Sequence, residues 1–230
     1  MPSIAALLDT LEGLYGAQTP SWPTDPYSFL IWWHSGYPAS DASCTKGWES
    51  LKSQIGVDPD RLLSTSPAKL TLALKPGGMM PDIRAIRLQE IAERVQKEFG
   101  GDLRAALNGL SITQVRSALK KFPSIGNPGV DRILLFAGIS PVAAVASNCP
   151  HVLVRIRTGQ EPANYGKAYS EAQRLIAVEV PPTCDARIRA YLLLKCHGQQ
   201  LCKRSKPKCT ECPVAPSCAF FAGKTGGRSD

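Results

Sequence analysis

The sequence has no apolar run that approaches the ~18 residues needed to cross a membrane as a helix. Its N-terminus lacks the basic segment and the long apolar core of a signal peptide. We therefore expect no membrane partner and a cytoplasmic location. The sequence also shows no sustained period-two alternation, which half-buried strands require, and no internal repeat, which would indicate a solenoid.

Acidic residues are scarce relative to basic ones. The 230 residues include 19 Asp and Glu against 27 Lys and Arg, so the formal net charge is +8. A basic chain suits a polyanionic partner such as nucleic acid, although many basic proteins bind none. With 43% hydrophobic residues, the composition is that of a globular chain long enough for one large domain or two small ones.

Amphipathic segments predict about ten helices joined by short connections rich in glycine and proline. The longest is residues 82–99, where apolar residues repeat at helical spacing. Arg84 lies on that apolar face but in the first turn, from which we expect it to reach past the core. Residues 152–156 and 177–180 are ambiguous between short strands and helix. The fold class is therefore predicted to be all-α, as a compact bundle.

The chain has eight cysteines, and disulfides between them would be unusual in a reducing compartment. Four lie in residues 202–218 with the spacing C-x6-C-x2-C-x5-C: Cys202, Cys209, Cys212 and Cys218. That segment also holds three prolines and four basic side chains, so it should be an open loop. The other four are scattered, and we expect most of them to be small core residues: Cys44, Cys149, Cys184 and Cys196.

Four thiols in an open loop indicate a metal centre, because such a loop gives them no core to fill. Four thiolates can hold either one tetrahedral zinc ion or an iron–sulfur cluster. Structural zinc sites usually pair two short C-x2-4-C hooks, and here only Cys209 and Cys212 form one. The spacing therefore favours a [4Fe–4S] cluster, with zinc as the runner-up. Unrelated thiols or disulfides are the remaining alternative.

Residues 122–129, Phe-Pro-Ser-Ile-Gly-Asn-Pro-Gly, form a tight turn between two predicted helices. A turn that opens a helix leaves free N–H groups and a positive dipole end, which together make a phosphate site. Gly126 and Gly129 would let a phosphate approach the backbone closely. A plain turn between two antiparallel helices explains the same residues without a ligand.

Taken together, these motifs resemble those of the endonuclease III and adenine-glycosylase group of DNA repair enzymes. The cysteine spacing is similar to the iron–sulfur loop of that family, and His197-Gly198 stands where the family has the same pair. The segment 122–126 resembles the Leu-Pro-Gly-Val-Gly hairpin of helix–hairpin–helix glycosylases. Asp25-Pro26-Tyr27 and Tyr37–Asp41 resemble two further family segments, so the resemblance runs from about residue 25 to residue 218.

The resemblance implies two helical domains. Residues 24–138 would form a helical barrel that carries the helix–hairpin–helix, and residues 1–23 with 139–230 would form a second helical domain with the iron–sulfur loop 202–218. Double-stranded DNA, damaged or mismatched, would be the partner of a nucleoid-associated monomer. The residues implied in DNA binding are Tyr37, Lys120, Lys121, Ile125, Gly126, Asn127, Gly129, Lys203 and Arg204.

The catalytic positions of the family are not filled in the usual way. Members that also cut the strand use a lysine five residues after the hairpin proline, and that position is Pro128. The position of the catalytic aspartate is Ala146. Ser147 or Asn148 could hold a water instead, whereas we expect Asp131 to be a solvated or capping carboxylate.

Two functions follow. The first is a base-excision-repair DNA glycosylase that flips out a damaged or mispaired base and hydrolyses its N-glycosidic bond, without lyase activity. The second is a catalytically silent relative that recognises DNA or its lesions. The sequence does not separate a natural Ala146 from an introduced one.

Overall fold

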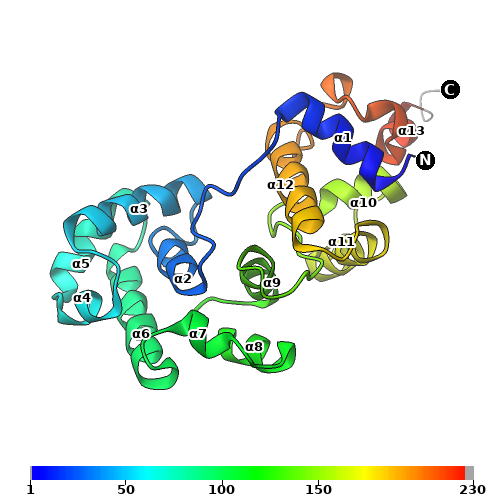
Figure 1. The fold of residues 1–230 in the computed structure, drawn as a ribbon. Helices are drawn as coiled ribbons and strands as arrows, with labels where there is room; N and C mark the ends of the chain where they lie inside the picture. Colours follow the sequence, from blue (N-terminus) through cyan, green and yellow to red (C-terminus); the bar gives the residue numbers. More distant parts are fainter. Residues whose placement is uncertain (1, 226–230) are drawn as a thin grey trace. The chain divides into compact units, whose positions relative to one another are not determined.

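The computed structural model describes residues 2–225 (Figure 1). Within them it contains thirteen α-helices, three short 3-10 helices and no strand, so the predicted all-α class is confirmed. The two ambiguous segments are helical: residues 152–156 lie within one helix, and residues 177–180 are the end of another together with its C-cap, Val180. No helix among the described residues is long and apolar enough to span a membrane. The end of the predicted second domain, residues 226–230, lies outside the described part.

The chain divides into two compact units, Pro20–Ile133 and Met1–Thr19 with Leu134–Asp230. We call the first the hairpin unit and the second the cysteine unit. These bounds differ by a few residues from the predicted domain limits at residues 24 and 138, which stay a prediction.

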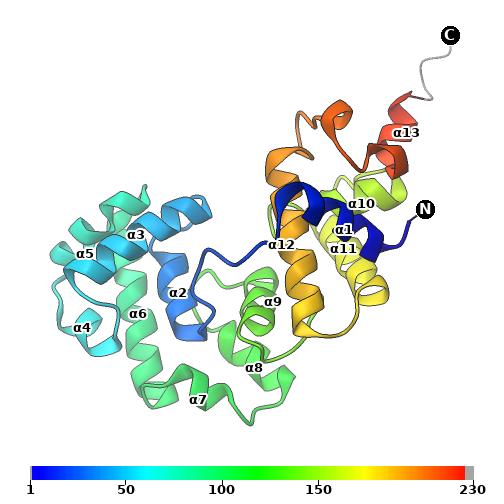
Figure 2. The same ribbon diagram turned by 45° about the horizontal axis from the view of Figure 1, so that its top comes forward.

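The hairpin unit contains α2 to α8 and most of α9. Its helices are α2 (Pro26–His34), α3 (Asp41–Gln54), α4 (Pro59–Ser64), α5 (Pro67–Leu74), α6 (Pro81–Phe99), α7 (Leu103–Leu107), α8 (Ile112–Leu119) and α9 (Asn127–Phe136). Helix α6 packs against α4 and α5 and also contacts α2 (Figure 2). Leu30, Leu51, Leu70 and Leu88 are fully buried between these helices.

Short polar caps explain why these helices begin where they do. Asp25, Ser40, Asp58, Ser66 and Ser111 each accept a hydrogen bond from the first turn of the helix that follows. Proline stands in the first turn of α2, α4, α5 and α6, where its missing N–H costs nothing. The local sequence therefore sets the helix starts before any tertiary contact forms.

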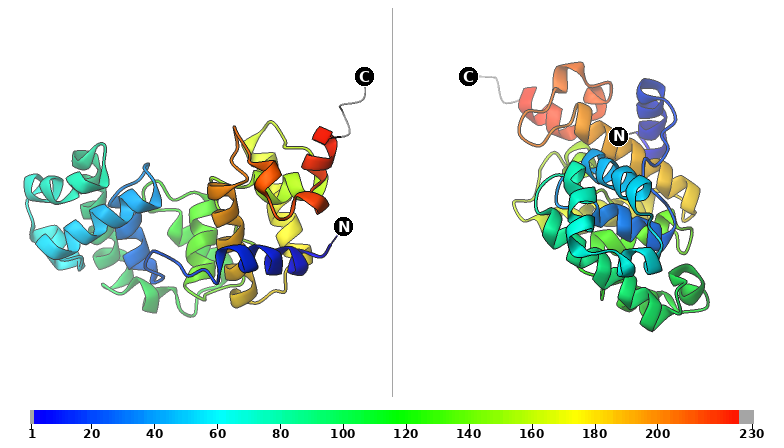
Figure 3. Two further views of the ribbon diagram at one scale, coloured as in Figure 1. Left: turned by 90° about the horizontal axis from the view of Figure 1, so that it is seen from above. Right: turned by 90° about the vertical axis from the view of Figure 1, so that its left-hand side faces the viewer.

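The cysteine unit brings the N-terminal helix together with the last third of the chain. Its helices are α1 (Ile4–Tyr15), α10 (His151–Thr158), α11 (Tyr165–Glu179), α12 (Cys184–Gln200) and α13 (Ala219–Thr225). Helix α1 lies against α12, and α10 packs against α11, α12 and α13 (Figure 3). Two 3-10 turns, Cys209–Glu211 and Ala215–Ser217, are the regular structure of the cysteine loop.

Arg84 corrects one prediction. Its side chain does not reach past the core but is 1% exposed, and its guanidinium donates hydrogen bonds to four backbone carbonyl groups. The acceptors are Ser35, Leu74, Gly78 and Met79, which come from the end of α2, the end of α5 and the loop after it. The five N–H groups of arginine can satisfy several converging carbonyls at once, which an apolar residue at this position could not do.

Candidate nucleic-acid interface and cysteine-lined pocket

The hairpin between α8 and α9 is anchored by its apolar residues. Phe122 is 2% exposed and stacks on Phe99 of α6, with ring centroids 5.8 Å apart. Ile125 is 6% exposed, so its side chain belongs to the core and only its backbone can face a ligand. Ser124 has a φ of +55°, a conformation that reverses the chain between these two anchors.

The tip of the hairpin is exposed at the predicted phosphate site. Gly126 and Asn127 are exposed, and α9 begins at Asn127 with the N–H of Val130 donating to the carbonyl of Gly126. Asn127 and Gly129 carry first-turn N–H groups, which the helix itself cannot satisfy, whereas Pro128 has none. An added Cβ at Gly126 would meet only Pro128, at 3.8 Å, so the tip is open.

Basic side chains flank this tip. Lys120 and Lys121 follow directly on α8 and are both exposed. The Nζ of Lys121 lies 3.1 Å from a carboxylate oxygen of Glu98, so part of its charge is already neutralised. Lys120 is therefore the better of the two for a phosphate contact.

Tyr37 is connected with the hairpin through His34, by a ring contact on one side and a hydrogen bond on the other. The ring of Tyr37 stacks on Trp33 with centroids 4.9 Å apart and lies edge-on to His34. His34 is fully buried, and its Nε2 donates a 2.8 Å hydrogen bond to the carbonyl of Pro123. The structure thus brings together the predicted DNA-binding residues Tyr37 and the hairpin through His34, which the sequence did not single out.

Helix α9 is held by two ion pairs. Asp131 is not solvated as expected but 2% exposed, and it pairs with Arg116 of α8 at 2.5 Å. Arg132 pairs with Asp41 of α3 at 3.0 Å, and its guanidinium lies 3.7 Å from the ring centroid of Trp22. Both ion pairs position α9. Because Asp131 is buried against Arg116, it is not a candidate for the catalytic carboxylate.

The segment around Ala146 lies in the cysteine unit. Ala146 is 4% exposed and lines a small pocket whose walls are mainly apolar, while Ser147 and Asn148 are exposed. Backbone bonds hold the segment, since Gln173 donates to the carbonyl of Ala143 and the N–H of Cys149 to that of Ala146. The polar groups available beside the predicted acid position are therefore those of Ser147 and Asn148.

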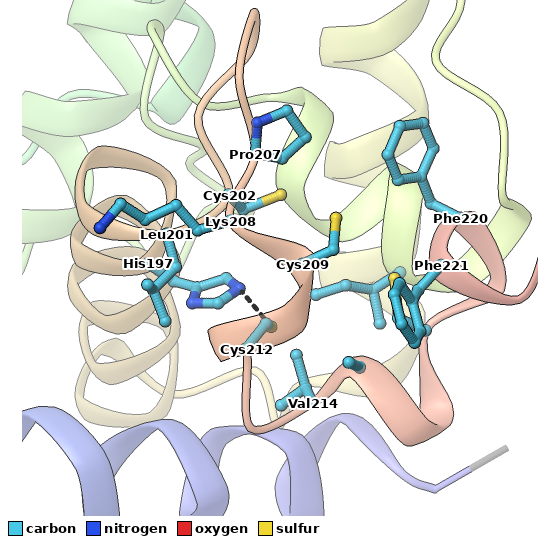
Figure 4. Close-up of a pocket in the computed structure, with 13 residues that line it drawn as sticks. His197, Leu201, Cys202, Pro207, Lys208, Cys209, Cys212, Val214, Phe220 and Phe221 are labelled. Atoms are coloured by element: carbon cyan, nitrogen blue, oxygen red, sulfur yellow. Dashed lines mark hydrogen bonds between the residues drawn. The ribbon is translucent and has the colours of Figure 1, made fainter. Parts of the chain in front are cut away.

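The four cysteines of residues 202–218 line one small pocket (Figure 4). Its other walls are mostly apolar, from Ile156, Leu201, Val214, Phe220 and Phe221. Burial raises the pKa of the Cys202 thiol to about 11 and also raises that of Cys212. Such thiols stay protonated at neutral pH unless a metal binds the thiolate form.

Hydrogen bonds from α10 fix the start of this loop. The guanidinium of Arg155 donates to the carbonyl groups of Lys203 and Arg204 and lies 3.9 Å from the Sγ of Cys202. His151 donates to the carbonyl of Cys202 at 2.8 Å and is 2% exposed, so it supports the start of the loop from within the core. The backbone of Lys203 and Arg204 is thus fixed while both side chains remain exposed.

Arg155 and Glu161 support the cysteine loop through an ion pair that no local sequence pattern indicates. Glu161 pairs with Arg155 at 2.7 Å and with Arg204 at 2.8 Å, so one carboxylate compensates two guanidinium groups. Among residues 2–225, no group of three or more His, Cys, Asp or Glu side chains is arranged to hold a single metal ion. The thiols share a pocket but not the tight tetrahedral shell, with Zn–S distances near ~2.3 Å, that one zinc ion needs.

Comparison with solved structures identifies the fold. A non-covalent endonuclease III–DNA complex matches with a TM-score of 0.74 at 16% identity over 97% of each chain. A thermostable thymine-DNA glycosylase matches with a TM-score of 0.73 at 21% identity over 95% of this chain and 96% of that one. The chain has the endonuclease III-like helix–hairpin–helix fold. The resemblance predicted from the cysteine spacing and the hairpin is confirmed.

Sequence comparison agrees with the endonuclease III-like assignment. The thymine-DNA glycosylase of Aeropyrum pernix is 26% identical over 169 residues, which is 71% of this chain and 69% of the relative. The thymine/uracil-DNA glycosylase of Pyrobaculum aerophilum is 24% identical over 164 residues, 71% of this chain and 67% of the relative. No family model matches the chain.

Proposed function

We propose that this chain is a DNA glycosylase of base excision repair that hydrolyses the N-glycosidic bond of a damaged or mispaired base and does not cut the strand. The observation that carries the proposal is the exposed tip of the hairpin at Gly126 and Asn127, mounted on a buried anchor in an endonuclease III-like fold. Relatives named as thymine and thymine/uracil glycosylases support it, and they make a mispaired thymine or uracil the first substrate to test.

Recognition of double-stranded DNA would rest on backbone and charge. The N–H groups of Asn127 and Gly129 would bind one phosphate, with Lys120 and Lys121 adding positive charge nearby. Tyr37 would stack on an unpaired or flipped base, since its ring is already held by Trp33. Lys203 and Arg204 would contact the backbone from the cysteine loop.

Hydrolysis would use neither the lysine nor the aspartate of the family, because those positions hold Pro128 and Ala146. Pro128 has no amine, so no Schiff base with the sugar can form there and the enzyme would release the base without lyase chemistry. Ala146 offers no charge, so Asn148 and Ser147 would orient a water toward the sugar carbon. The water oxygen bonds to that carbon as the bond to the base breaks, and a water proton ends on the departing base.

Cys202, Cys209, Cys212 and Cys218 would hold a [4Fe–4S] cluster. The donor set fits, since all four thiols line one apolar pocket and an Arg155 N–H lies near the Cys202 sulfur. Zinc is the weaker candidate, because the thiols are not gathered around a single point. The cluster would supply structural order to the basic loop, and no reaction step is assigned to it.

The buried position of Ala146 favours a second candidate, a silent DNA-binding relative. With its side chain 4% exposed, the position contributes nothing to a reacting sugar. Such a protein would recognise a lesion by the hairpin and Tyr37 and leave the base in place. A monomer and a nucleoid-associated cytoplasmic location are proposed for either function.

One panel of duplexes separates the two candidates. Wild type, Asn148→Ala and Ala146→Asp would be incubated with duplexes that carry T·G, U·G, U·A and alkylated or oxidised bases, and free base would be measured. Release by wild type and its loss in Asn148→Ala would support the glycosylase with its substituted water site. Release by Ala146→Asp alone would identify position 146 as a lost acid. Tight duplex binding with no release by any of the three would support the silent relative.

A further inference from the structure

A line of three side chains leads from the N-terminal helix to one of the four cysteines. Tyr15 is the last residue of α1, His197 lies on α12, and Cys212 lies in the cysteine loop. The hydroxyl of Tyr15 lies 3.0 Å from Nδ1 of His197, and Nε2 of the same ring lies 3.6 Å from the Sγ of Cys212. Figure 4 shows the imidazole beside the pocket, with its contact to Cys212 drawn as a dashed line.

The imidazole is buried in this position and has a hydrogen-bond partner on each side. His197 is 1% exposed, and its own carbonyl accepts hydrogen bonds from the N–H groups of Leu201 and Cys202, where α12 ends and the loop begins. The ring of Tyr15 packs against it with centroids 6.1 Å apart. Both ring nitrogens therefore have one partner each, and neither partner is water.

The direction of the two hydrogen bonds follows from the chemistry of a metal-bound thiolate. A sulfur that binds a metal has lost its proton and can only accept, so Nε2 must carry the hydrogen. A neutral imidazole then has Nδ1 as an acceptor, and the hydroxyl of Tyr15 must donate to it. The Tyr15 hydroxyl thus selects the tautomer that can donate to the sulfur, as an outer partner does for a metal-ligating histidine.

We propose that Tyr15 and His197 form a relay that donates a hydrogen bond to the Cys212 thiolate, retains the cluster and raises its reduction potential. The inference rests on the cluster assigned under the proposed function, but it makes no use of base release. A donor aimed at a ligand sulfur stabilises the extra negative charge of the reduced cluster more than the charge of the oxidised one. The mainly apolar pocket walls screen such a hydrogen bond less than water would.

Tyr15→Phe tests the relay, since it removes the hydroxyl and keeps the ring against His197. Tyr27→Phe is the matched control. Tyr27 is also half-buried and donates one hydrogen bond, to the carbonyl of Val57 in the hairpin unit. His197→Leu is the second variant, because it removes the donor itself. Each protein would be purified without oxygen and checked for helix content by circular dichroism and for iron and sulfide content.

Two readouts follow on the loaded proteins: the midpoint potential from a redox titration monitored by electron paramagnetic resonance, and the rate of bleaching by an iron chelator. We expect a lower midpoint and about tenfold faster bleaching in Tyr15→Phe, a larger change in His197→Leu, and wild-type values in Tyr27→Phe. A loaded Tyr15→Phe protein with the midpoint and bleaching rate of wild type would overturn the relay and leave the cluster assignment standing. Wild-type protein without iron would overturn both, whereas failure to release any base would count against the glycosylase alone.

Discussion

The Nε2 of His34 donates a 2.8 Å hydrogen bond to the carbonyl oxygen of Pro123. This single bond joins the end of α2 to the hairpin that presents Gly126 and Asn127. Because the carbonyl can only accept, the buried ring must keep its proton on Nε2. The same ring lies edge-on to Tyr37, so one side chain positions both parts of the proposed DNA interface.

Stability should depend on pH through His34. Burial lowers its pKa from 6.5 to about 4, because the imidazolium loses its hydration. Between pH 4 and pH 6.5, His34 is protonated in the unfolded chain and neutral in the folded chain. The contribution to the free energy of unfolding is therefore fully present above pH 6.5 and is lost as the pH falls toward 4, by roughly 3 kcal/mol in all.

Urea unfolding of wild type and of His34→Gln at pH 4.5 and 7.5 measures this contribution. Glutamine keeps a donor for the Pro123 carbonyl but does not titrate. The carboxylates and the other histidines are common to both proteins, so their titration cancels in the difference. We expect the free energy of unfolding of wild type to exceed that of His34→Gln by more at pH 7.5 than at pH 4.5. An equal difference at the two pH values would contradict a buried neutral ring.

Replacing Arg84 should destabilise the hairpin unit strongly. Its guanidinium donates to four carbonyl groups, of which those of Ser35 and Leu74 are buried, and Arg84→Met would leave all four without that donor. We expect a loss of about 3–5 kcal/mol in the free energy of unfolding, as when one side of a buried polar network is removed. Lys97→Met on the same helix is the control, because Lys97 is exposed and should change stability by only about 0.5 kcal/mol. Comparable losses in the two variants would refute the carbonyl-binding role.

Much of the fold follows from the sequence because its signals are local. Caps such as Ser111, the prolines that open helices and the apolar periodicity of α6 act within a few residues, so they predict helices and the all-α class. The burial of Arg84 and Asp131 differs from the expectation for the opposite reason. Their partners lie in other segments of the chain, and no local pattern shows that a polar side chain will be buried among them.

The candidate site divides in the same way. Its cysteines and its hairpin are contiguous motifs, and their spacing alone indicates their use. Tyr15, His34, Arg155 and Glu161 support those motifs through contacts made only in the folded chain. For His34 alone among these four residues, the local sequence hints at a role, because a histidine ends an otherwise apolar helix.

Binding to duplex DNA should depend on salt through the lysines beside the hairpin. Each neutralised phosphate contributes about one unit to the slope of log affinity against log salt. Lys120→Ala should therefore lower the slope by about 1, and Lys121→Ala by less, since Lys121 already pairs with Glu98. Fluorescence anisotropy from low to physiological salt measures the slopes, with Lys52→Ala, an exposed lysine on α3, as the control. Unchanged slopes for both hairpin variants would place the DNA elsewhere.

Removing the proposed cluster should loosen the cysteine loop and leave the hairpin unit intact. The regular structure of residues 202–218 amounts to two single turns. Arg155 and His151 hold the start of the loop by its backbone carbonyls, whereas Cys212 and Cys218 contact His197 and the Arg155 carbonyl through their sulfur atoms, which a cluster would bind. After removal of iron, trypsin should cut next to Lys208 at least tenfold faster, because cleavage needs a locally opened chain. Cleavage at Lys97 in α6 should keep its rate, which serves as the internal control. If the Lys208 site is equally slow with and without iron, protein contacts alone order the loop, and the cluster has no structural role there.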